Sequence, residues 1–309
     1  MIVSVVVTAF NEERFIGRCL SSLLSQDMDF EIIVVDDGSG DGTSRVVDSF
    51  VKQYPSRVRL VRLEKNQGLG NARNIGARHS SGRVVVFLDA DMEFPPDFVR
   101  KLVAPVLEGA ALASCHSSEV IANTGNPWVK VQGQKVRGVG QAAKTGFIRA
   151  VDRQFFLSAG GFDASKGFFD DVSFHEKTGV EAVVVDAVLL HHNPDTAREI
   201  FWRNVWIGRS VLKHHKHGDV LVMLVKRLLD FIAFFGVVLL FTPLWFVDLM
   251  CFLFFGLVVF RHRALPSDSV RESMLVRLAY VPLYRWVRAA GFVKGLLESL
   301  SGRGWEKKA

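Results

Sequence analysis

Short β-branched runs alternate with helical stretches over about the first 110 residues of the chain. The runs are bounded by turn or polar residues, as buried strands are: Ile2–Val7, Glu31–Val35, Val58–Leu63 and Arg83–Leu88. The stretches around them predict helices at Glu12–Ser25, Thr43–Tyr54, Gly70–His79 and Asp97–Leu107. Such alternation is typical of an α/β sandwich with a mainly parallel sheet.

Local signals refine this pattern. Asn11 stands where the N-cap of the first helix is expected, with Glu12 and Glu13 in the first turn.

After about residue 110 the alternation of strand and helix patterns becomes irregular. Val129–Gly146, rich in Gly, Gln and Lys, predicts a mobile loop, and Ala182–Leu190 predicts a further strand.

The residues Phe231–Phe260 form an apolar run that contains one charge, Asp248, and one proline, Pro243. A straight helix of that length spans about 45 Å, whereas the hydrocarbon core of a bilayer is roughly 30 Å thick. Basic residues flank both ends, which favours both ends on the cytoplasmic side. The run predicts a membrane hairpin bent near Pro243, either re-entrant or of two tight spans; the alternative is a buried soluble helix.

Charge divides the chain unevenly. Residues 220–309 carry 12 Lys and Arg against 6 Asp and Glu, whereas residues 1–219 carry 26 of each. The basic excess therefore belongs to the tail and does not indicate a nucleic-acid surface on the main domain. We expect an α/β domain over residues 1–219, the hairpin over 220–265 and a basic amphipathic tail over 266–309. The tail suits an in-plane helix on anionic lipid, with a solvated packing helix as the alternative.

The three cysteines, Cys19, Cys115 and Cys251, are too few and too far apart for a disulfide framework or an all-cysteine zinc site. A reducing, cytosolic setting fits them best. The apolar run at the start is short and lacks the basic region of a signal peptide.

Polar clusters follow three of the predicted strands, where ligands gather in open α/β sheets. They are Thr8–Glu12, Asp36–Ser39 and Asp89–Asp91. Carboxylates that meet there repel one another unless a cation lies between them, and a hard divalent ion such as Mg²⁺ or Mn²⁺ suits oxygen ligands. Because such an ion commonly bridges phosphates, the clusters predict a nucleotide-diphosphate ligand.

A glycine turn at Gly68–Gly70 enters a helix that carries Arg73. An arginine near the start of such a helix can meet phosphate. The alternative is a simple helix start with a surface arginine.

Taken in order along the chain, these motifs resemble those of family 2 glycosyltransferases of the GT-A fold. The matching stretches are Ser4–Glu13, Leu20–Gln26, Glu31–Ser39, Asn66–Ala77, Gly82–Asp91 and Phe169–Phe174. The resemblance covers about residues 1–215 and does not extend to the apolar run. It implies a GT-A fold, with a Rossmann-like mixed, mainly parallel sheet, and an enzyme that consumes a nucleotide sugar, UDP- or GDP-linked.

The resemblance also implies roles for the residues that bind the donor. Phe10 and Asp37 would hold the base, and Thr8 and Glu12 would lie near the nucleoside. Arg73 would approach the base or a phosphate.

For the metal, the resemblance implies that Asp89 lies near the ribose and the ion and that Asp91 is the main ligand. Glu93 stands where polyprenyl-phosphate sugar synthases have a further ligand. In related enzymes a histidine near His191 and His192 contacts the diphosphate or the metal; a structural histidine is the alternative.

The pair Asp170 and Asp171 matches the acidic motif of the family on the acceptor side. That match makes Asp171 the general base, which removes the proton of an acceptor hydroxyl as it attacks the anomeric carbon. Attack opposite the leaving group inverts the anomeric centre. A cap pair at a helix N-terminus is the alternative, and both interpretations can hold together.

The expected function is inverting transfer of a single sugar to a membrane-located acceptor, either a lipid-linked glycan or a polyprenyl phosphate, at the cytoplasmic face. The processive synthases of the family carry Gln-x-x-Arg-Trp. Here Pro282 precedes the pair Arg285–Trp286 at the glutamine position, which argues against a chain-extruding synthase. The alternatives are a nucleotidyltransferase that makes sugar nucleotides and a non-catalytic membrane scaffold.

Overall fold

The computed structural model describes residues 2–133, 135–139, 147–214, 220, 222–227, 229 and 280–301. They fall into two compact units, one with the described residues of 1–122 and 136–192 and the other with those of 123–135 and 193–304. The apolar run that predicts the hairpin lies outside the described residues, as does the tail before Tyr280. The domain limits at residues 219 and 265 stay predictions.

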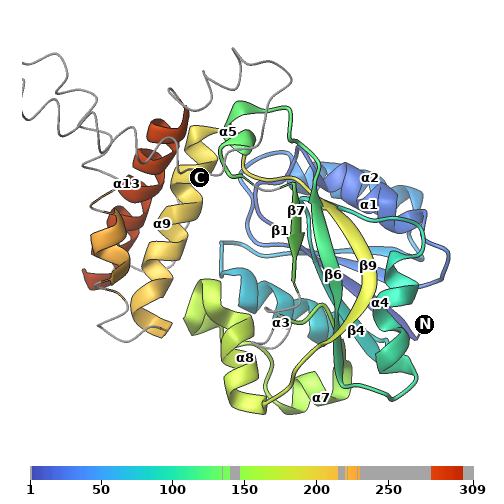
Figure 1. Cartoon of the computed structure of the whole chain (residues 1–309). Helices are drawn as coiled ribbons and strands as arrows, with labels where there is room; N and C mark the ends of the chain where they lie inside the picture. The colour runs from blue at the N-terminus through green and yellow to red at the C-terminus, as the bar shows by residue number, and fades with distance from the viewer. Residues whose placement is uncertain are drawn as a thin grey trace, which may run out of the picture. The chain divides into compact units, whose positions relative to one another are not determined.

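The first unit contains the whole sheet and its helices (Figure 1). The strands are β1 (Val3–Ala9), β2 (Glu31–Asp36), β3 (Val58–Arg62), β4 (Val84–Asp89), β5 (Met92–Glu93), β6 (Ala113–Ile121), β7 (Val136–Gly138), β8 (Ala150–Asp152) and β9 (Val183–His191). The helices are α1 (Ile16–Leu24), α2 (Thr43–Gln53), α3 (Leu69–His79), α4 (Phe98–Leu107), α7 (Arg153–Ser158), the 3₁₀ helix η1 (Ala164–Phe169) and α8 (Asp170–Thr178).

The strands form one mixed sheet in the order β3-β2-β1-β4-β8-β6-β9-β5, and β7 pairs with β6. The neighbours among β1 to β4 are parallel, as predicted, and β6 also runs parallel to β9. The pairings of β8 with β4 and β6, and of β5 with β9, are antiparallel. The predicted α/β class with a mainly parallel first half is confirmed.

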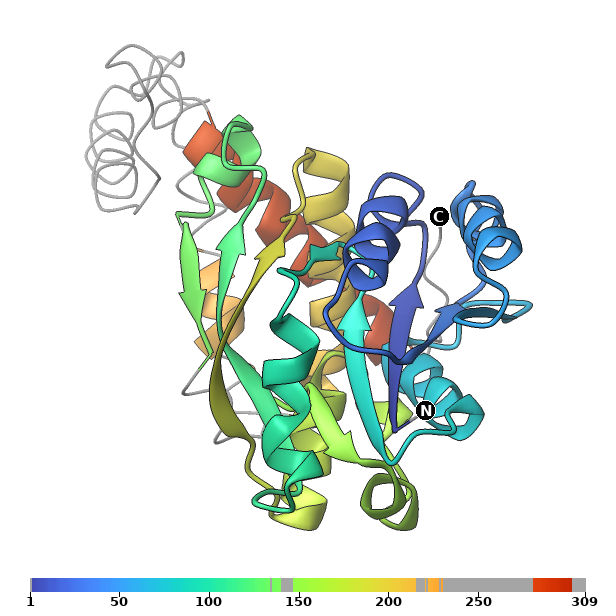
Figure 2. The same ribbon diagram turned by 90° about the vertical axis from the view of Figure 1, so that its right-hand side faces the viewer.

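Helices cover both faces of the sheet because the inner strands are apolar on both sides (Figure 2). On one face Val5 and Val7 of β1 belong to a core with side chains of α1, α2 and α4. On the other, Val6 belongs to a core with side chains of α3, α7 and α8. This three-layer arrangement leaves the strand ends as the place for polar groups.

The predicted start of the first helix is wrong. Helix α1 begins at Ile16 with Phe15 at its N-cap. Asn11 instead adopts a positive φ of 57°, and its side chain accepts a hydrogen bond from the Gly40 N–H over 2.8 Å. Asn11 thus joins the loops after β1 and β2, because asparagine tolerates this backbone conformation and can bond locally.

The predicted loop at Val129–Gly146 is only partly irregular. It contains the end of α5 (Pro127–Lys130) and the strand β7, while residues 134 and 140–146 lie outside the described part. The strand predicted at Ala182–Leu190 is confirmed as β9.

The second unit is built on α9 (Ala197–His214) and α13 (Val281–Leu300), which lie side by side in both views (Figures 1 and 2). Residues of α5, α9 and α13 share an apolar cluster that includes Val131, Ile200 and Tyr284. Within the tail, α13 therefore packs on a protein neighbour, as the alternative interpretation proposed. None of the helices that the structure describes is long and apolar enough to cross a membrane.

Candidate active site

The carboxyl ends of β1, β2 and β4 lie side by side at one edge of the sheet. Thr8 of β1 is in register with Val35 of β2 and with Asp89 of β4. Asp37 follows β2, and its N–H donates to the Ala9 carbonyl over 2.8 Å. The expected meeting of three polar strand ends is present.

Asp89 lies between two buried arginines. Its Oδ1 accepts from Arg73 Nη2 and its Oδ2 from Arg149 Nη1, each over 3.0 Å. Burial disfavours the charge on Asp89, but the guanidiniums of Arg149 and Arg73 outweigh it and hold its pKa well below the usual range. Both oxygens of Asp89 are thus committed to arginines.

Arg73 also lies near the acidic pair that is predicted for the acceptor side. Its Nη1 lies 3.7 Å from Oδ2 of Asp170, a residue that is 2% exposed. Burial raises the pKa of Asp170 to about 7, and the neighbouring Arg73 opposes this shift only in part. A Cβ on Gly70 would lie 2.8 Å from the same Oδ2, so this glycine lets α3 approach the carboxyl group closely.

Asp171 follows in the first turn of α8 and is half-buried. The Asp171 N–H donates to Oδ1 of Asp170 over 2.9 Å, and the Val172 N–H donates to Oδ1 of Asp171 over 2.8 Å. These bonds satisfy backbone groups at the start of a helix and leave each carboxyl group a second oxygen. Burial also raises the pKa of Asp171.

Asp91 faces the imidazole of His191, which ends β9. Asp91 Oδ2 lies 3.3 Å from His191 Nε2, and no described residue hydrogen-bonds the buried Oδ1 of Asp91. Burial disfavours the imidazolium, but the nearby carboxylates of Asp91 and Glu119 outweigh it and raise the pKa of His191 to about 9.

Glu93 pairs with the next histidine instead. Its Oε1 lies 2.7 Å from His192 Nε2, and the His192 ring stacks on Phe15 at a centroid distance of 4.9 Å. Arg18 lies 3.9 Å from the same oxygen. Glu93 therefore belongs to a separate cluster between α1 and the end of β9.

The structure does not bring the three expected metal ligands together. Asp89 is held by arginines, while Asp91 and Glu93 each face a different histidine. Within the described part of the chain, no three His, Cys, Asp or Glu side chains are grouped so as to hold an ion.

Asp91 and His191 nevertheless fit part of a divalent site. A buried carboxylate oxygen that lacks a hydrogen bond is costly unless something fills its place. A carboxylate oxygen beside an imidazole nitrogen is also a donor set that Mn²⁺ accepts. These two residues would hold the ion, and oxygens from outside the protein would complete its shell.

On the nucleoside side, Asp37 organises the loop before α3. Its two oxygens accept the N–H groups of Gln67 over 2.6 Å and of Gly68 over 2.9 Å. Gly68 has a φ of 90°, which glycine adopts without strain.

The other expected donor residues lie at the end of β1 or just after it. Thr8 is buried, and its Oγ1 finds no hydrogen-bond partner among the described residues. The Glu12 N–H donates to Thr43 Oγ1 over 2.8 Å, and Phe10 is partly exposed at the same strand end. The structure therefore brings Thr8, Asp37 and Arg73 to one edge of the sheet.

Two buried charged residues of this region were not predicted. Arg149 interrupts the apolar stretch Ile148–Val151, and Glu119 lies within β6. A charge inside an apolar stretch needs a partner if the stretch is buried, and this signal would have identified Arg149, just before β8. Glu119 lies in a stretch with many polar residues, so its charge does not stand out against an apolar background.

The mixed sheet with acidic strand ends, and the acidic pair that Arg73 links to Asp89, agree with the GT-A fold that the resemblance implies. The chain matches the family described as "Glycosyl transferase family 2" over residues 4–168. The chain therefore belongs to this family.

Solved structures support the fold. The mannosyltransferase PcManGT from Pyrobaculum calidifontis, in complex with GDP-Man and Mn²⁺, aligns with a TM-score of 0.53 at 19% identity, covering 98% of this chain and 88% of that one. GalNAc-T7 with UDP, GalNAc and Mn²⁺ aligns with a TM-score of 0.51 at 21% identity, covering 62% and 43%.

Relatives by sequence include two transferases named for polyprenyl phosphates. The chain is 32% identical over 111 residues to undecaprenyl-phosphate 4-deoxy-4-formamido-L-arabinose transferase of Shewanella sediminis, covering 35% of this chain and 34% of that protein. It is 34% identical over 115 residues to dolichol-phosphate mannosyltransferase of Pyrococcus furiosus, covering 37% and 32%. The chain thus spans about a third of the length of these relatives.

Proposed function

We propose that the protein transfers a single sugar, with inversion, from a nucleotide-diphosphate sugar to a membrane-located acceptor. The main support for this proposal is the position of Arg73. It contacts Asp89 at the expected donor edge and lies near Asp170 of the acceptor-side motif. Two carboxylates with separate expected roles thus meet at one buried cation.

The donor would lie along the edge formed by β1, β2 and β4. Phe10 and Asp37 would bind the base, Thr8 and Glu12 would line the nucleoside, and Arg73 would face the base or a phosphate. The solved relatives bound to UDP and to GDP-Man support a UDP- or GDP-linked sugar.

A divalent ion, Mn²⁺ or Mg²⁺, would be held by Asp91 and His191. When bound, it would stabilise the negative charge of the departing diphosphate. Asp89 would act beside it by fixing Arg73 and Arg149, and Glu93 would join only if it released His192. The two solved relatives with Mn²⁺ support the choice of ion.

Asp171 would be the general base. An acceptor hydroxyl must lose its proton as it attacks the anomeric carbon, and a positioned base supplies about 10²–10⁴ in rate. A raised pKa places the base nearer neutral pH, where proton transfer is more favourable. Asp170 would hold Arg73 in position behind it.

The acceptor would be a lipid-linked glycan or a polyprenyl phosphate at the cytoplasmic face. The apolar run at 231–260 and the two relatives named for polyprenyl phosphates support a lipid carrier. An acceptor phosphate is already ionised and would depend less on Asp171.

A thermal-shift titration with UDP and GDP, with and without Mn²⁺, tests the donor site. A ligand at 100 times its Kd adds about 2.7 kcal/mol of stability, and Asp91→Asn should abolish the metal-dependent part. Labelled nucleotide sugars with lipid extracts then test turnover. Free nucleoside diphosphate is the expected product; pyrophosphate would point to a nucleotidyltransferase, and binding without turnover to a scaffold.

A further inference from the structure

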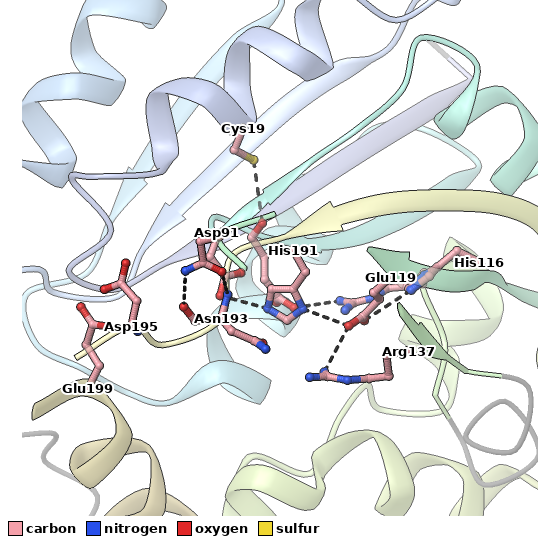
Figure 3. A network of polar contacts seen from close by, with 12 residues as sticks. Cys19, Asp91, His116, Glu119, Arg137, His191, Asn193, Asp195 and Glu199 are labelled. Carbon is pink, nitrogen blue, oxygen red and sulfur yellow. Dashed lines mark hydrogen bonds and ion pairs between the residues drawn. The ribbon is translucent and has the colours of Figure 1, made fainter. Parts of the chain in front are cut away.

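His191 is held between two carboxylates that come from different strands (Figure 3). Its Nε2 lies 3.3 Å from Asp91 Oδ2, and its Nδ1 lies 2.9 Å from Glu119 Oε2. Glu119 is 3% exposed, so its carboxylate is shielded from bulk solvent. Each ring nitrogen therefore has a defined carboxylate partner.

The pairing of β6 with β9 explains why Glu119 meets this ring. The two strands are parallel, and His191 is in register with Ile121, two residues after Glu119 on the same face of β6. Between His116 and Ser118 the register shifts by one residue, because β9 advances from Val185 to Val188 over the same interval. Without this irregularity Leu190 would stand in the place of His191.

Glu119 is itself fixed from other sides (Figure 3). Arg137 Nη1 on β7 donates to Glu119 Oε2 over 3.1 Å. The buried His116 places Nε2 3.4 Å from Glu119 Oε1. A carboxylate held by these groups cannot swing away from His191 without leaving buried charges unpaired.

We propose that Glu119 is a positioning residue that fixes the orientation and tautomer of His191, an inference that rests on the proposed metal role of Asp91 and His191. A metal ion binds the neutral imidazole, and a carboxylate that accepts its Nδ1–H then leaves the Nε2 lone pair directed at the opposite side. Asp91, whose Oδ1 has no hydrogen bond from a described residue, lies on that side. Loss of such an outer partner typically weakens metal binding 10–100-fold.

Electron paramagnetic resonance of free Mn²⁺, in titrations with Mn²⁺ alone and with UDP or GDP, measures this effect directly. Glu119→Gln should weaken Mn²⁺ binding 10–100-fold. Glu108→Gln, an exposed substitution of the same chemistry at the end of α4, should leave it unchanged. Thermal unfolding in EDTA reports separately whether each variant is folded.

A double-mutant cycle with His191→Ala separates positioning from a general structural role. If Glu119 acts through His191, Glu119→Gln has no further effect on Mn²⁺ affinity in the His191→Ala background. A loss of the same size in both backgrounds would overturn the inference. Glu119→Asp, which keeps the charge and shortens its reach, serves in the same cycle if the Gln variant does not fold.

The outcomes distinguish this inference from the proposed function. Mn²⁺ binding that weakens with His191→Ala and not with Glu119→Gln overturns the role of Glu119 and leaves the metal site intact. Wild-type protein that binds no Mn²⁺ with either nucleotide overturns both.

Discussion

The carboxyl group of Asp170 is deeply buried, and the cation beside it also pairs with a second carboxylate. Its carboxyl group is 2% exposed, and the Arg73 guanidinium near it also serves Asp89. Desolvation therefore exceeds the compensation from the cation, and the folded protein holds a proton that an unfolded Asp releases. Sites that tolerate such a cost commonly serve function at the expense of stability.

Asp170→Asn should stabilise the fold, and more so at pH 8 than at pH 5. The folded pKa of about 7 is above the usual value of about 3.9, so wild-type stability declines as the pH rises between these values. The extra gain between the two pH values is on the order of 2 kcal/mol, because each pKa unit is worth about 1.4 kcal/mol. Urea unfolding measures it, with the exposed Asp29→Asn as control. An equal gain at both pH values would contradict the argument.

Asp171→Asn should lower kcat by about 10²–10⁴ while the thermal shift given by UDP or GDP with Mn²⁺ is retained. Asparagine keeps the shape and the cap of α8 but cannot accept the acceptor proton. The acidic limb of the pH–rate profile should disappear with the carboxylate. A loss far below tenfold would remove the general-base role and favour an acceptor phosphate.

Among the elements, the side chain of Glu31 links the amino-terminal ends of β1, β2 and β3 to the residues before β4. Glu31 of β2 accepts from Ser4 Oγ of β1 over 2.6 Å and from Arg59 Nη2 of β3 over 2.6 Å. The N–H and Oγ of Ser81, before β4, donate to the same carboxylate over 2.7 and 2.6 Å. This fastening lies at the opposite end of the strands from the site.

Glu31→Gln should destabilise the protein at pH 7 by about 1–3 kcal/mol. Burial opposes ionisation of Glu31, but the hydrogen bonds from Ser4 and Ser81 and the charge of Arg59 outweigh it and lower its pKa. A depressed pKa gives stability that is present above about pH 4.3 and lost as the pH falls through the folded value. The difference between variant and wild type should therefore shrink below pH 4 in thermal unfolding; a constant difference would contradict this role.

The helices α9 and α13 touch at backbone level through three glycines. A Cβ on Gly208 would lie 2.2 Å from the Phe292 carbonyl oxygen, and one on Gly295 would lie 2.0 Å from that of Val205. Gly291 is equally close to the opposite helix. Backbone atoms cannot yield as a flexible side chain does, so the pair depends on these residues remaining glycine.

Gly295→Ala should force the two helices apart and cost about 1–3 kcal/mol, the usual range for overpacking. The control is Gly125→Ala in the same unit, where an added Cβ meets nothing within 4 Å. Urea unfolding followed by circular dichroism measures both. Equal stability of the two variants would show that α13 is not held against α9 in this way.

Periodicity predicted the elements whose apolar pattern is unbroken. The strands β1 to β4 and β9 were placed within two residues, because buried strands need continuous β-branched runs. Strand β6 was missed, since His116 and Glu119 interrupt its apolar pattern, and β5 is too short to produce one. Asn11 was misassigned because cap residues and residues with positive φ share the same side chains.

The candidate site shows the same limit. Motifs at strand ends predicted that Asp89 and Asp91 lie at one edge with Asp37, since β1, β2 and β4 run parallel, whereas Asp171 was predicted from the family resemblance. Their partners are distant in the sequence: Arg149 binds Asp89 from 60 positions away, and His191 faces Asp91 from 100 positions away. Such contacts depend on the register of long-range strands, and local sequence carries no signal for it.

For the molecule as a whole, the uneven charge and the apolar run make separable contributions to membrane binding. Residues 220–309 carry the entire net charge of +6, and residues 231–260 hold a single charged side chain. Lys and Arg near an anionic surface contribute about 1 kcal/mol each at physiological salt, and 1 M salt reduces the screening length to about 3 Å. Apolar insertion does not depend on screening in this way.

The full chain should therefore sediment with neutral vesicles and bind anionic vesicles at least tenfold more tightly. In 1 M NaCl the anionic advantage should vanish while binding to neutral vesicles persists. Arg261→Gln with Arg263→Gln should reduce the advantage, whereas the exposed pair Lys52→Gln with Arg78→Gln removes the same charge from the first unit and should leave it unchanged. Binding that requires anionic lipid and is fully reversed by salt would instead mean that the apolar run does not enter the bilayer.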